Sequence, residues 1–461
     1  MIHHVRAAPT AGFVLFWLDA AFLLLGWRLV VLTVGDAAPI GLAGLAFPAL
    51  VLLFLYALGL HRREALVGAR AMLSRLPLAA GFGSLAGWAA VWLLPDGMGA
   101  PAGAHLLFAA AVPCLTAAGL AARLTLFLLR RWGAFRRRLL VIGAGRRAWD
   151  LVWILRHEAR TLAFDVTFLH APAMGEVDAR LRADPANQVI EGPADLLAIA
   201  HAFAPDQIVV APDERRGLAM EGLFACKMAG YPVSEYAQFL EREAGRIDLK
   251  RLDLGWLLYA DGFTVGTVSR VAKRSLDIAA SALLLAWMAP TLLLAALAVR
   301  LGDGGPALYC QVRLTRGNRG FPMLKLRTMT TNAERNGAVW AAEQDPRVTR
   351  VGWLLRRTRV DELPQLLNVL RGDMSFVGPR PERPEFTEEL AARLPLYRER
   401  HLVRSGLTGW AQVNYPYGAS LNDARSKLSY DLYYVKNFGI LLDLRIMLQT
   451  LRVVFWPGGV R

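Results

Sequence analysis

Two carboxylates stand side by side at Asp361 and Glu362, directly before a stretch whose pattern predicts a helix. Pro364 fits the first turn of that helix, so the pair would lie at its N-terminus, where the backbone dipole favours negative charge. An acidic helix cap is the plainer interpretation of such a pair. In the chemical alternative, one carboxylate stays ionised there and attacks phosphorus to form an acyl phosphate, while its neighbour holds Mg²⁺.

The surroundings of the pair favour the chemical interpretation. Basic residues are more frequent around it than a cap requires, and clustered basic side chains are typical of phosphate binding. Glycine and proline recur in GPALY, RGNRG, VGPRP and SGLTGW, which predicts turns where backbone N–H groups approach a ligand. This part of the chain has one histidine, His401, so its chemistry must depend on carboxylates, basic side chains and a divalent metal. The basic residues are Lys325, Arg327, Arg356, Arg357, Arg359, Arg371 and Arg380.

The elements that must position this site include a largely apolar run at 276–299, long enough to cross a bilayer. Pro290 lies near its centre, where proline removes a hydrogen bond and bends a helix. A spanning helix would place the arginines that follow it outside the cell, against the positive-inside rule. We therefore expect a re-entrant membrane helix broken at Pro290, with the buried core of a soluble domain as the alternative.

Apolar stretches also fill the first part of the chain, 1–130, and each is close to the ~20 residues that a membrane helix needs. The sequence predicts a bundle of four membrane helices, or three if the glycine-containing stretch 78–95 does not span. Asp19, Arg28 and Arg123 lie inside the first and last stretches, so they must face other helices or reach the membrane surface. Loop arginines place both termini and everything after the fourth stretch in the cytoplasm. The stretches are 12–34, 39–60, 78–95 and 103–129.

Residues 131–235 alternate between strand and helix patterns, which predicts an α/β Rossmann-like domain. Gly143 and Gly145 fit the glycine-rich turn of a nucleotide-binding site. The acidic residue that would hold a ribose hydroxyl is missing, because His170 stands where the second strand ends. We expect a degenerate domain without a bound dinucleotide, followed by a connector at 236–270.

The net charge of +15 fits contact with anionic lipid headgroups or phosphorylated substrates, and not with nucleic acid, in so apolar a chain. Cys114, Cys226 and Cys310 are too widely spaced for a disulfide or metal pattern, which suits a reducing compartment. No tyrosine is followed four places later by lysine, so the signature of short-chain oxidoreductases and dehydratases is missing.

Several motifs in one order resemble the bacterial sugar transferases, the monotopic phosphoglycosyl transferases. These motifs lie within 271–461 and are KRSLDI, GPALYCQVR, FPMLKLRTM, DELPQLLNVLRGDMSFVGPRPERP and SGLTGWAQVN. The whole outline resembles the long members of that family, the polyprenyl-phosphate hexose-1-phosphate transferases. The pattern ERE-G-IDL-RL-WL-DGF before the last third resembles their exopolysaccharide-associated subgroup.

This resemblance implies a multi-pass enzyme of the bacterial inner membrane, with an α-rich catalytic domain at 271–461 on the cytoplasmic side. It would transfer hexose-1-phosphate from a UDP-sugar to undecaprenyl phosphate, release UMP and initiate exopolysaccharide biosynthesis. Asp361 matches the nucleophile that carries the phosphosugar intermediate, and Glu362 matches the Mg²⁺-binding acid. The resemblance also implies a homodimer. The remaining implied site residues are Arg356 and Arg380 facing substrate phosphates, Lys325 and Arg327 in a basic motif, and Asp431 or Asp443 as a C-terminal aspartate.

Two other functions stay open at this point. A membrane-anchored, NAD-dependent sugar-nucleotide dehydratase would bind its cofactor at Gly143 and Gly145. A non-enzymatic scaffold for polysaccharide assembly would not need Asp361 or Glu362.

Overall fold

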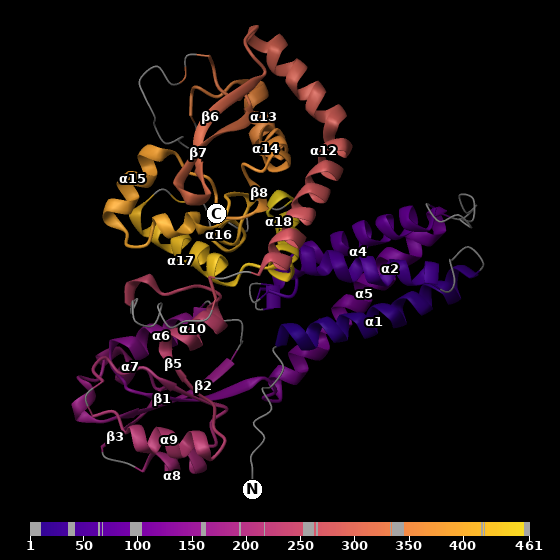
Figure 1. Ribbon diagram of the computed structural model, residues 1–461. Helices are drawn as coiled ribbons and strands as arrows, with labels where there is room; N and C mark the ends of the chain where they lie inside the picture. Colours follow the sequence, from indigo (N-terminus) through magenta and orange to yellow (C-terminus); the bar gives the residue numbers. More distant parts are fainter. Residues whose placement is uncertain are drawn as a thin grey trace. The chain divides into compact units, whose positions relative to one another are not determined.

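The structure is a computed structural model that divides into two compact units, Met1–Gly245 and Arg246–Arg461. Figure 1 shows the elements of each unit. The structure describes residues 11–35, 42–62, 65–66, 68–92, 104–157, 163–192, 195–215, 217–251, 262–263, 266–331, 333, 345–415, 418 and 420–455.

Four long helices occupy the apolar stretches in the described part of 11–131. By length and composition, Ala11–Val34 and Leu106–Arg131 could cross a membrane, whereas the second helix is shorter. The third begins well before position 78 and takes in Arg70 and Arg75, so the prediction of four spans stays a prediction. Positions 39–41, 93–95 and 103 of the predicted stretches lie outside the described residues. The helices are α1 (Ala11–Val34), α2 (Leu42–Ala57), α4 (Ala69–Trp92) and α5 (Ala104–Arg131).

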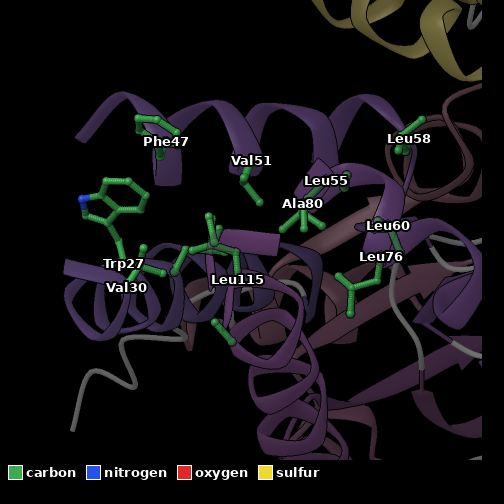
Figure 2. Close-up of a cluster of buried hydrophobic side chains, with 14 of the residues drawn as sticks. Trp27, Val30, Phe47, Val51, Leu55, Leu58, Leu60, Leu76, Ala80 and Leu115 are labelled. Atoms are coloured by element: carbon green, nitrogen blue, oxygen red, sulfur yellow. The ribbon is translucent and has the colours of Figure 1, made fainter. Parts of the chain in front are cut away.

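An apolar core joins these helices (Figure 2). Trp27 of α1 stacks on Phe47 of α2, with ring centroids 4.3 Å apart and an interplanar angle of 14°. Gly83 of α4 lies so close to Val51 of α2 that a Cβ atom at this glycine would collide with the valine backbone. Small residues allow such close helix packing. The glycine that lowers the hydropathy of the third stretch is therefore needed where α4 meets α2.

The ionisable residues inside these helices largely face one another. Arg123 of α5 donates a hydrogen bond from Nη1 to Asp19 Oδ1 of α1 at 2.7 Å, and His61 Nε2 lies 3.0 Å from Asp19 Oδ2. The side chains of Asp19 and Arg123 are both buried. The expectation that such groups must face other helices is confirmed for this pair, whereas Arg28 is exposed.

A five-stranded parallel sheet forms the second part of the first unit, in the order β3-β2-β1-β4-β5. This is the strand order of a Rossmann-type fold, so the α/β part of the predicted fold class is confirmed. Helices α6, α7 and α10 cover one face, while α8 and α9 cover the other (Figure 1). The elements are β1 (Arg136–Ile142), α6 (Arg146–His157), β2 (Ala163–His170), α7 (Ala179–Ala183), β3 (Gln188–Glu191), α8 (Leu196–Phe203), β4 (Gln207–Val210), α9 (Met220–Met228), β5 (Val233–Glu235) and α10 (Tyr236–Ala244).

The segment predicted as a connector, 236–270, is shared between the two units. Helix α10 buries Phe239 and Leu240 in the core of the sheet, so the α/β fold continues past the predicted boundary at 235. Beyond it, Ile247 packs in the second unit, where its N–H donates to the Ser429 carbonyl at 3.1 Å. Positions 252–261 and 264–265 of the segment lie outside the described residues.

The second unit is rich in helices, as predicted, and contains two small sheets. Strands β6 and β7 form an antiparallel hairpin, and β8 and β9 form a parallel pair. Trp410, Tyr434 and Ile446 belong to the core that joins α16, α17 and α18. The elements are α12 (Thr267–Asp303), β6 (Leu308–Thr315), β7 (Arg319–Leu326), α13 (Arg350–Thr358), α14 (Gln365–Arg371), β8 (Ser375–Val377), α15 (Pro384–Arg393), β9 (Gly406–Thr408), α16 (Trp410–Asn414), α17 (Leu421–Asn437) and α18 (Ile440–Phe455).

Helix α12 continues through Pro290 without interruption, and it bends along its length in Figure 1. Its 37 residues span about 55 Å at ~1.5 Å per residue. Within it, Thr267–Gly302 has the length and composition to cross a membrane, and Leu283 and Trp287 are more than 70% exposed. The predicted break at Pro290 is not present, because a proline can be accommodated by bending the helix. A re-entrant course of α12 stays a prediction.

Candidate active site

The acidic pair lies in a short 3-10 helix, η5 (Val360–Glu362), between α13 and α14. The residue before it, Arg359, has a left-handed backbone conformation with φ of 59°, and its N–H donates to the Arg356 carbonyl at 3.3 Å. Such a conformation is uncommon for a residue with a Cβ atom and is concentrated at functional sites. This turn ends α13 and places its basic C-terminus next to the two acids.

Neither carboxylate is the N-cap residue of a helix, so the helix-cap interpretation is not supported. Arg359 is the N-cap residue of η5 and Pro364 that of α14, and neither makes a side-chain cap hydrogen bond. The physical reason is that the pair lies in a separate 3-10 turn before α14, where its side chains make other contacts. Pro364 does lie at the helix start, as predicted.

Three cations surround the carboxylate of Glu362. Its Oε1 atom accepts a hydrogen bond from Arg380 Nη2 at 3.0 Å and lies 3.7 Å from both Lys325 Nζ and Arg359 Nη1. Burial alone would raise the pKa of Glu362, but the charges of Arg380, Lys325 and Arg359 outweigh burial and lower this pKa to about 2. Glu362 is therefore an ionised carboxylate over the whole physiological range.

Asp361 has the opposite electrostatic environment. Its side chain is buried, and its Oδ1 atom has no hydrogen-bond partner among the described residues. Burial, followed by the negative charge of Glu362, raises the pKa of Asp361 from 3.8 to about 6. The helix start therefore does not hold the pKa of Asp361 at a low value. At neutral pH Asp361 is still mainly a carboxylate, but a desolvated one, which is the state expected of a nucleophile.

The predicted basic residues differ in how near they lie to the pair. Lys325 on β7 contacts Glu362, whereas Arg356 on α13 donates from Nε to Thr328 Oγ1 at 2.9 Å, and its charge lowers the pKa of Asp361. The guanidinium of Arg327 instead approaches Gly305, where a Cβ atom would collide with it. The structure thus brings Lys325 and Arg380 into direct contact with the pair, and leaves Arg327 aside.

The two C-terminal aspartates lie in separate buried ion pairs. Asp443 Oδ2 is 2.6 Å from Lys273 Nζ, and Asp443 Oδ1 accepts a hydrogen bond from the Tyr434 hydroxyl at 2.8 Å. Asp431 Oδ2 is 2.7 Å from Arg400 Nη2. Among the described residues, these two aspartates thus pair with Lys273 and Arg400, and not with the acidic pair.

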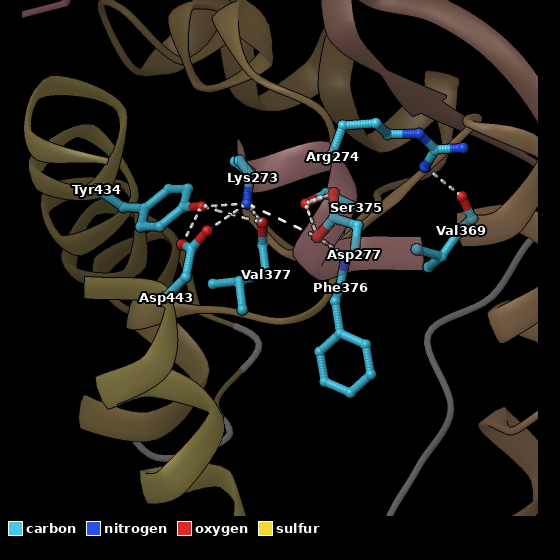
Figure 3. Close-up of polar contacts among 9 residues, drawn as sticks. All are labelled: Lys273, Arg274, Asp277, Val369, Ser375, Phe376, Val377, Tyr434 and Asp443. Carbon is cyan, nitrogen blue, oxygen red and sulfur yellow. Dashed lines mark hydrogen bonds and ion pairs between the residues drawn. The ribbon is translucent and has the colours of Figure 1, made fainter. Parts of the chain in front are cut away.

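Figure 3 shows how the motif KRSLDI joins α12 to the rest of the unit. Lys273 contacts Asp443 and also donates to the Val377 carbonyl at 3.1 Å. Arg274 donates to the Val369 carbonyl at 2.6 Å, at the C-terminal end of α14, where a cation is favoured. Asp277 accepts from the Ser375 hydroxyl at 3.0 Å. This motif therefore fixes the membrane-length helix to α14, β8 and α18.

The glycines of VGPRP and SGLTGW were predicted to let backbone N–H groups approach a ligand, but here they allow two segments of the protein to pack closely. Gly378 and Gly406 lie so close that a Cβ atom on either would collide with backbone atoms. The Gly378 N–H donates to the Thr408 carbonyl, and the Gly406 N–H donates to the Pro379 carbonyl, both at 2.8 Å. These N–H groups are used inside the protein, because the two segments pack backbone against backbone.

The glycine-rich turn of the α/β unit is similarly closed by its own side chains. Asp213 accepts hydrogen bonds from the N–H groups of Arg146 and Arg147 at 2.6 and 2.9 Å, at the start of α6. His170 Nδ1 accepts from the Ala144 N–H at 3.2 Å. In nucleotide-binding folds the start of this helix holds a phosphate group. The carboxylate of Asp213 takes that position here.

The described residues contain no cluster of three His, Cys, Asp or Glu side chains arranged for a metal ion. Mg²⁺ does not require one, since it is usually held by one or two carboxylates together with waters and substrate phosphates. Asp361 and Glu362 provide two adjacent carboxylates, and the buried Oδ1 atom of Asp361 lacks a partner within the described part of the chain. The pair therefore fits a Mg²⁺ ion that shares its ligands with a phosphorylated substrate.

Sequence reasoning missed the contact of Arg359 with Glu362, that of Thr328 with Arg356 and that of Arg400 with Asp431. Arg359 was visible only as one of several nearby arginines. Thr328 could have been found as the last residue of the basic KxRT motif. Nothing in the sequence spacing relates Arg400 to the pair.

Comparison with known proteins relates the second unit to a protein family. Residues 268–457 match the profile described as bacterial sugar transferase. The chain is 40% identical over 242 residues to a UDP-N-acetylgalactosamine-undecaprenyl-phosphate N-acetylgalactosaminephosphotransferase of Aeromonas hydrophila, covering 52% of this chain and 56% of the relative. It is 47% identical over 191 residues to a UDP-glucose:undecaprenyl-phosphate glucose-1-phosphate transferase of Caulobacter vibrioides, covering 40% and 72%.

A third relative is the "Exopolysaccharide production protein PSS" of Rhizobium leguminosarum bv. phaseoli. It is 42% identical to this chain over 189 residues, which cover 39% of this chain and 93% of the relative. The matches cover between about half and nearly all of these three relatives.

Proposed function

This chain belongs to the bacterial sugar transferase family, and from that membership we propose that it transfers a sugar-1-phosphate from a UDP-sugar to undecaprenyl phosphate and releases UMP. The observation that carries the proposal is the acidic pair. Asp361 is buried with an acceptor atom that no described residue contacts, beside a Glu362 held by three cations. Relatives named for this transfer, at 47% and 40% identity, support the proposal.

In the first step, an ionised Asp361 oxygen attacks the phosphorus that bears the sugar. A bond forms between phosphorus and the Asp361 oxygen, the bond from phosphorus to the bridging oxygen breaks, and UMP leaves with that oxygen. The product is an acyl phosphate of the sugar on Asp361, as in other covalent phosphoryl transfers. The raised pKa of Asp361, about 6, makes its carboxylate a stronger base than an exposed one while leaving it ionised at neutral pH.

In the second step, a phosphate oxygen of undecaprenyl phosphate attacks the same phosphorus. The bond to Asp361 breaks, the carboxylate is regenerated, and the sugar remains on a lipid diphosphate. Lys325 and Arg380 contact Glu362, and their positive charges can also bind the phosphate oxygens of the substrate. Glu362 would hold Mg²⁺, which supplies charge neutralisation on the diphosphate when bound.

The membrane assignment follows from the helices. Three described helices have the length and composition of membrane spans, and one of them, α12, belongs to the catalytic unit and exposes large apolar side chains. We place the protein in the bacterial inner membrane with the catalytic unit in the cytoplasm, where the arginine-rich loops favour it. A lipid-phosphate acceptor lies at the bilayer surface, so a shallow, re-entrant course of α12 would bring it to the site.

The α/β unit is proposed to bind no dinucleotide, because Asp213 and His170 already accept the hydrogen bonds of the glycine-rich turn. An NAD-dependent dehydratase would instead need these backbone N–H groups to be open to its cofactor. The relative named for exopolysaccharide production supports a first step of exopolysaccharide synthesis as the biological setting. The homodimer implied by the family resemblance is tested by the mass of the protein in nanodiscs.

The test of the function is UMP release by the full chain in membranes or nanodiscs with undecaprenyl phosphate. The donors should include UDP-glucose, UDP-galactose and UDP-N-acetylgalactosamine, because the relatives are named for both glucose and N-acetylgalactosamine. Donor labelled in the sugar-bearing phosphate should label the protein when acceptor is omitted. Asp361→Asn should abolish both signals, whereas Asp213→Ala should keep them. Turnover by Asp361→Asn would rule out the nucleophile assignment.

A further inference from the structure

Arg400 lies in the 3-10 helix η6 (Arg398–Leu402), and its side chain is buried. The guanidinium contacts three groups. Nη1 donates to the Tyr397 hydroxyl at 2.9 Å, while Nη2 donates to the Arg380 carbonyl at 3.0 Å and pairs with Asp431 Oδ2 at 2.7 Å. Arg380 in turn donates from its own guanidinium to Glu362 at 3.0 Å. A continuous series of polar contacts thus runs from α17 to the acidic pair.

We infer that Arg400, held by Asp431, is a positioning residue that fixes the Arg380 backbone and so directs the Arg380 guanidinium toward Glu362. This inference rests on the proposed function, because it assigns Arg400 a role in the same reaction. It also gives Asp431 a role through Arg400, in place of a contact with the substrate.

The chain around Arg380 explains why the hydrogen bond to the Arg380 carbonyl can control the position of its side chain. Arg380 stands between Pro379 and Pro381, which have fixed φ angles and no N–H groups. Each of the three successive carbonyls is bound by a different element. The Gly406 N–H binds that of Pro379 at 2.8 Å, Arg400 binds that of Arg380, and Arg313 Nη1 binds that of Pro381 at 3.4 Å. Loss of the middle contact would let this peptide plane rotate and carry the Arg380 side chain with it.

Stability alone is a weak reason for the Arg400–Asp431 pair. Removing two charges from water costs about as much as their attraction returns, and apolar replacements are often equally stable. The Nε atom of Arg400 is buried without a hydrogen-bond partner among the described residues, which adds to that cost. A costly pair whose guanidinium binds the backbone of a site residue is better explained by the geometry that it enforces.

The alternative is that Asp431 contacts the substrate directly. Asp431 and Arg400 also border a small cavity, whose other lining residues include Glu382, Ser420 and Lys427. A substrate group in this cavity would meet Asp431 whether or not Arg380 was in place. The two interpretations therefore differ in whether the effect of Arg400 depends on Arg380.

A double-mutant cycle on the full chain in nanodiscs separates them, with kcat/KM for UMP release as the first readout. Arg400→Met should lower kcat/KM by about tenfold when Arg380 is present, within the range of coupling between contacting residues. In the Arg380→Lys background the same change should cost less than about twofold, because the group that Arg400 positions is gone. The dissociation constant of the UDP-sugar is measured for the wild type, both single variants and the double variant. It gives the same comparison where turnover is too slow.

The matched control is Ser429→Ala, which removes a buried hydrogen bond of 2.6 Å to the Ile247 carbonyl from the same helix as Asp431. Any loss from this control should be equal in both backgrounds. If Arg400→Met does not fold, Tyr397→Phe removes only the hydroxyl that Arg400 contacts and should show the same dependence on Arg380. Equal losses in both backgrounds would overturn the inference while UMP release by the wild type kept the proposed function. A wild type that releases no UMP would overturn the function itself.

Discussion

Replacing Asp361 by Asn should stabilise the protein while removing its activity. The pKa of Asp361 is raised from 3.8 to about 6, so the ionised carboxylate is less stable in the folded protein than in the unfolded chain. Ionisation of Asp361 therefore opposes folding at any pH above 3.8, the ordinary pKa of this group. Two units correspond to about 3 kcal/mol of destabilisation at neutral pH, at ~1.4 kcal/mol per unit. Asn has almost the same shape and carries no charge, so it should recover much of this free energy.

The pH dependence makes this prediction specific. The penalty is nearly absent at about pH 4, increases as the pH rises, and is complete above about pH 6. The unfolding temperature of Asp361→Asn, followed by fluorescence in nanodiscs, should exceed that of the wild type by several degrees at pH 7.5, since ~1 kcal/mol is worth ~2–4 °C in a unit of this size. At pH 4.5 most of that difference should be gone.

Glu362→Gln is the matched control, because it makes the same chemical change at the next residue with the opposite expected sign. The pKa of Glu362 is lowered to about 2, so its ionised form stabilises the fold above pH 4.5, and this contribution is lost as the pH falls through 2. Glu362→Gln should therefore unfold at a lower temperature at pH 7.5. The reasoning is refuted if Asp361→Asn gains no stability at pH 7.5, or gains equally at pH 4.5 and 7.5.

Three further predictions concern other contacts described above. UMP release should fall as the pH drops below about 6 with protonation of Asp361, and Lys325→Met should move this limb to higher pH, because the charge of Lys325 lowers the pKa of Asp361. Lys273→Met should destabilise the second unit by about 3–5 kcal/mol in thermal unfolding, because it leaves Asp443 buried without its cation. Asp213→Ala should cost about 1 kcal/mol in unfolding of the α/β unit, as for loss of a helix cap, with UMP release unchanged.

Each of these has a clear contradicting result. An acid limb that Lys325→Met leaves in place would mean that this lysine does not act on Asp361. An unfolding temperature of Lys273→Met equal to that of the wild type would show that the cluster in Figure 3 does not hold the fold. Binding of NAD or NADH by the wild type in calorimetry, lost in a Gly145→Ala variant, would contradict the closed turn at Asp213.

The apolar helices near the N-terminus and the Rossmann-type sheet were predictable because each depends on local pattern. An apolar stretch such as 103–129 predicts a helix regardless of its partners, and an apolar strand followed by a glycine turn, as at Gly143, predicts an α/β unit. Boundaries were less predictable. Phe239 lies in a segment with mixed charge and apolar character, and only its packing on the sheet shows that α10 belongs to the first unit.

The residues that we propose for the chemistry were also visible in the sequence, since Asp361, Glu362 and the basic motif lie in contiguous stretches. What each one does depended on the fold. Asp431 and Asp443 were equivalent candidates by sequence, and the structure gives each a different buried partner, Arg400 and Lys273. Pairing across 31 or 170 positions is set by how helices pack, because sequence spacing does not constrain it.

The sequence by itself determined that this protein has a part made of long apolar helices, a Rossmann-like part and a carboxylate pair among cations, because composition and short-range pattern suffice for each. Only the tertiary structure decided that Asp361 is protonated more easily than Glu362. Burial and charge–charge energies depend on distances in space. Lys325, Arg359 and Arg380 come from separate elements and converge on one carboxylate, while its neighbour in sequence is left desolvated and without a partner among the described residues.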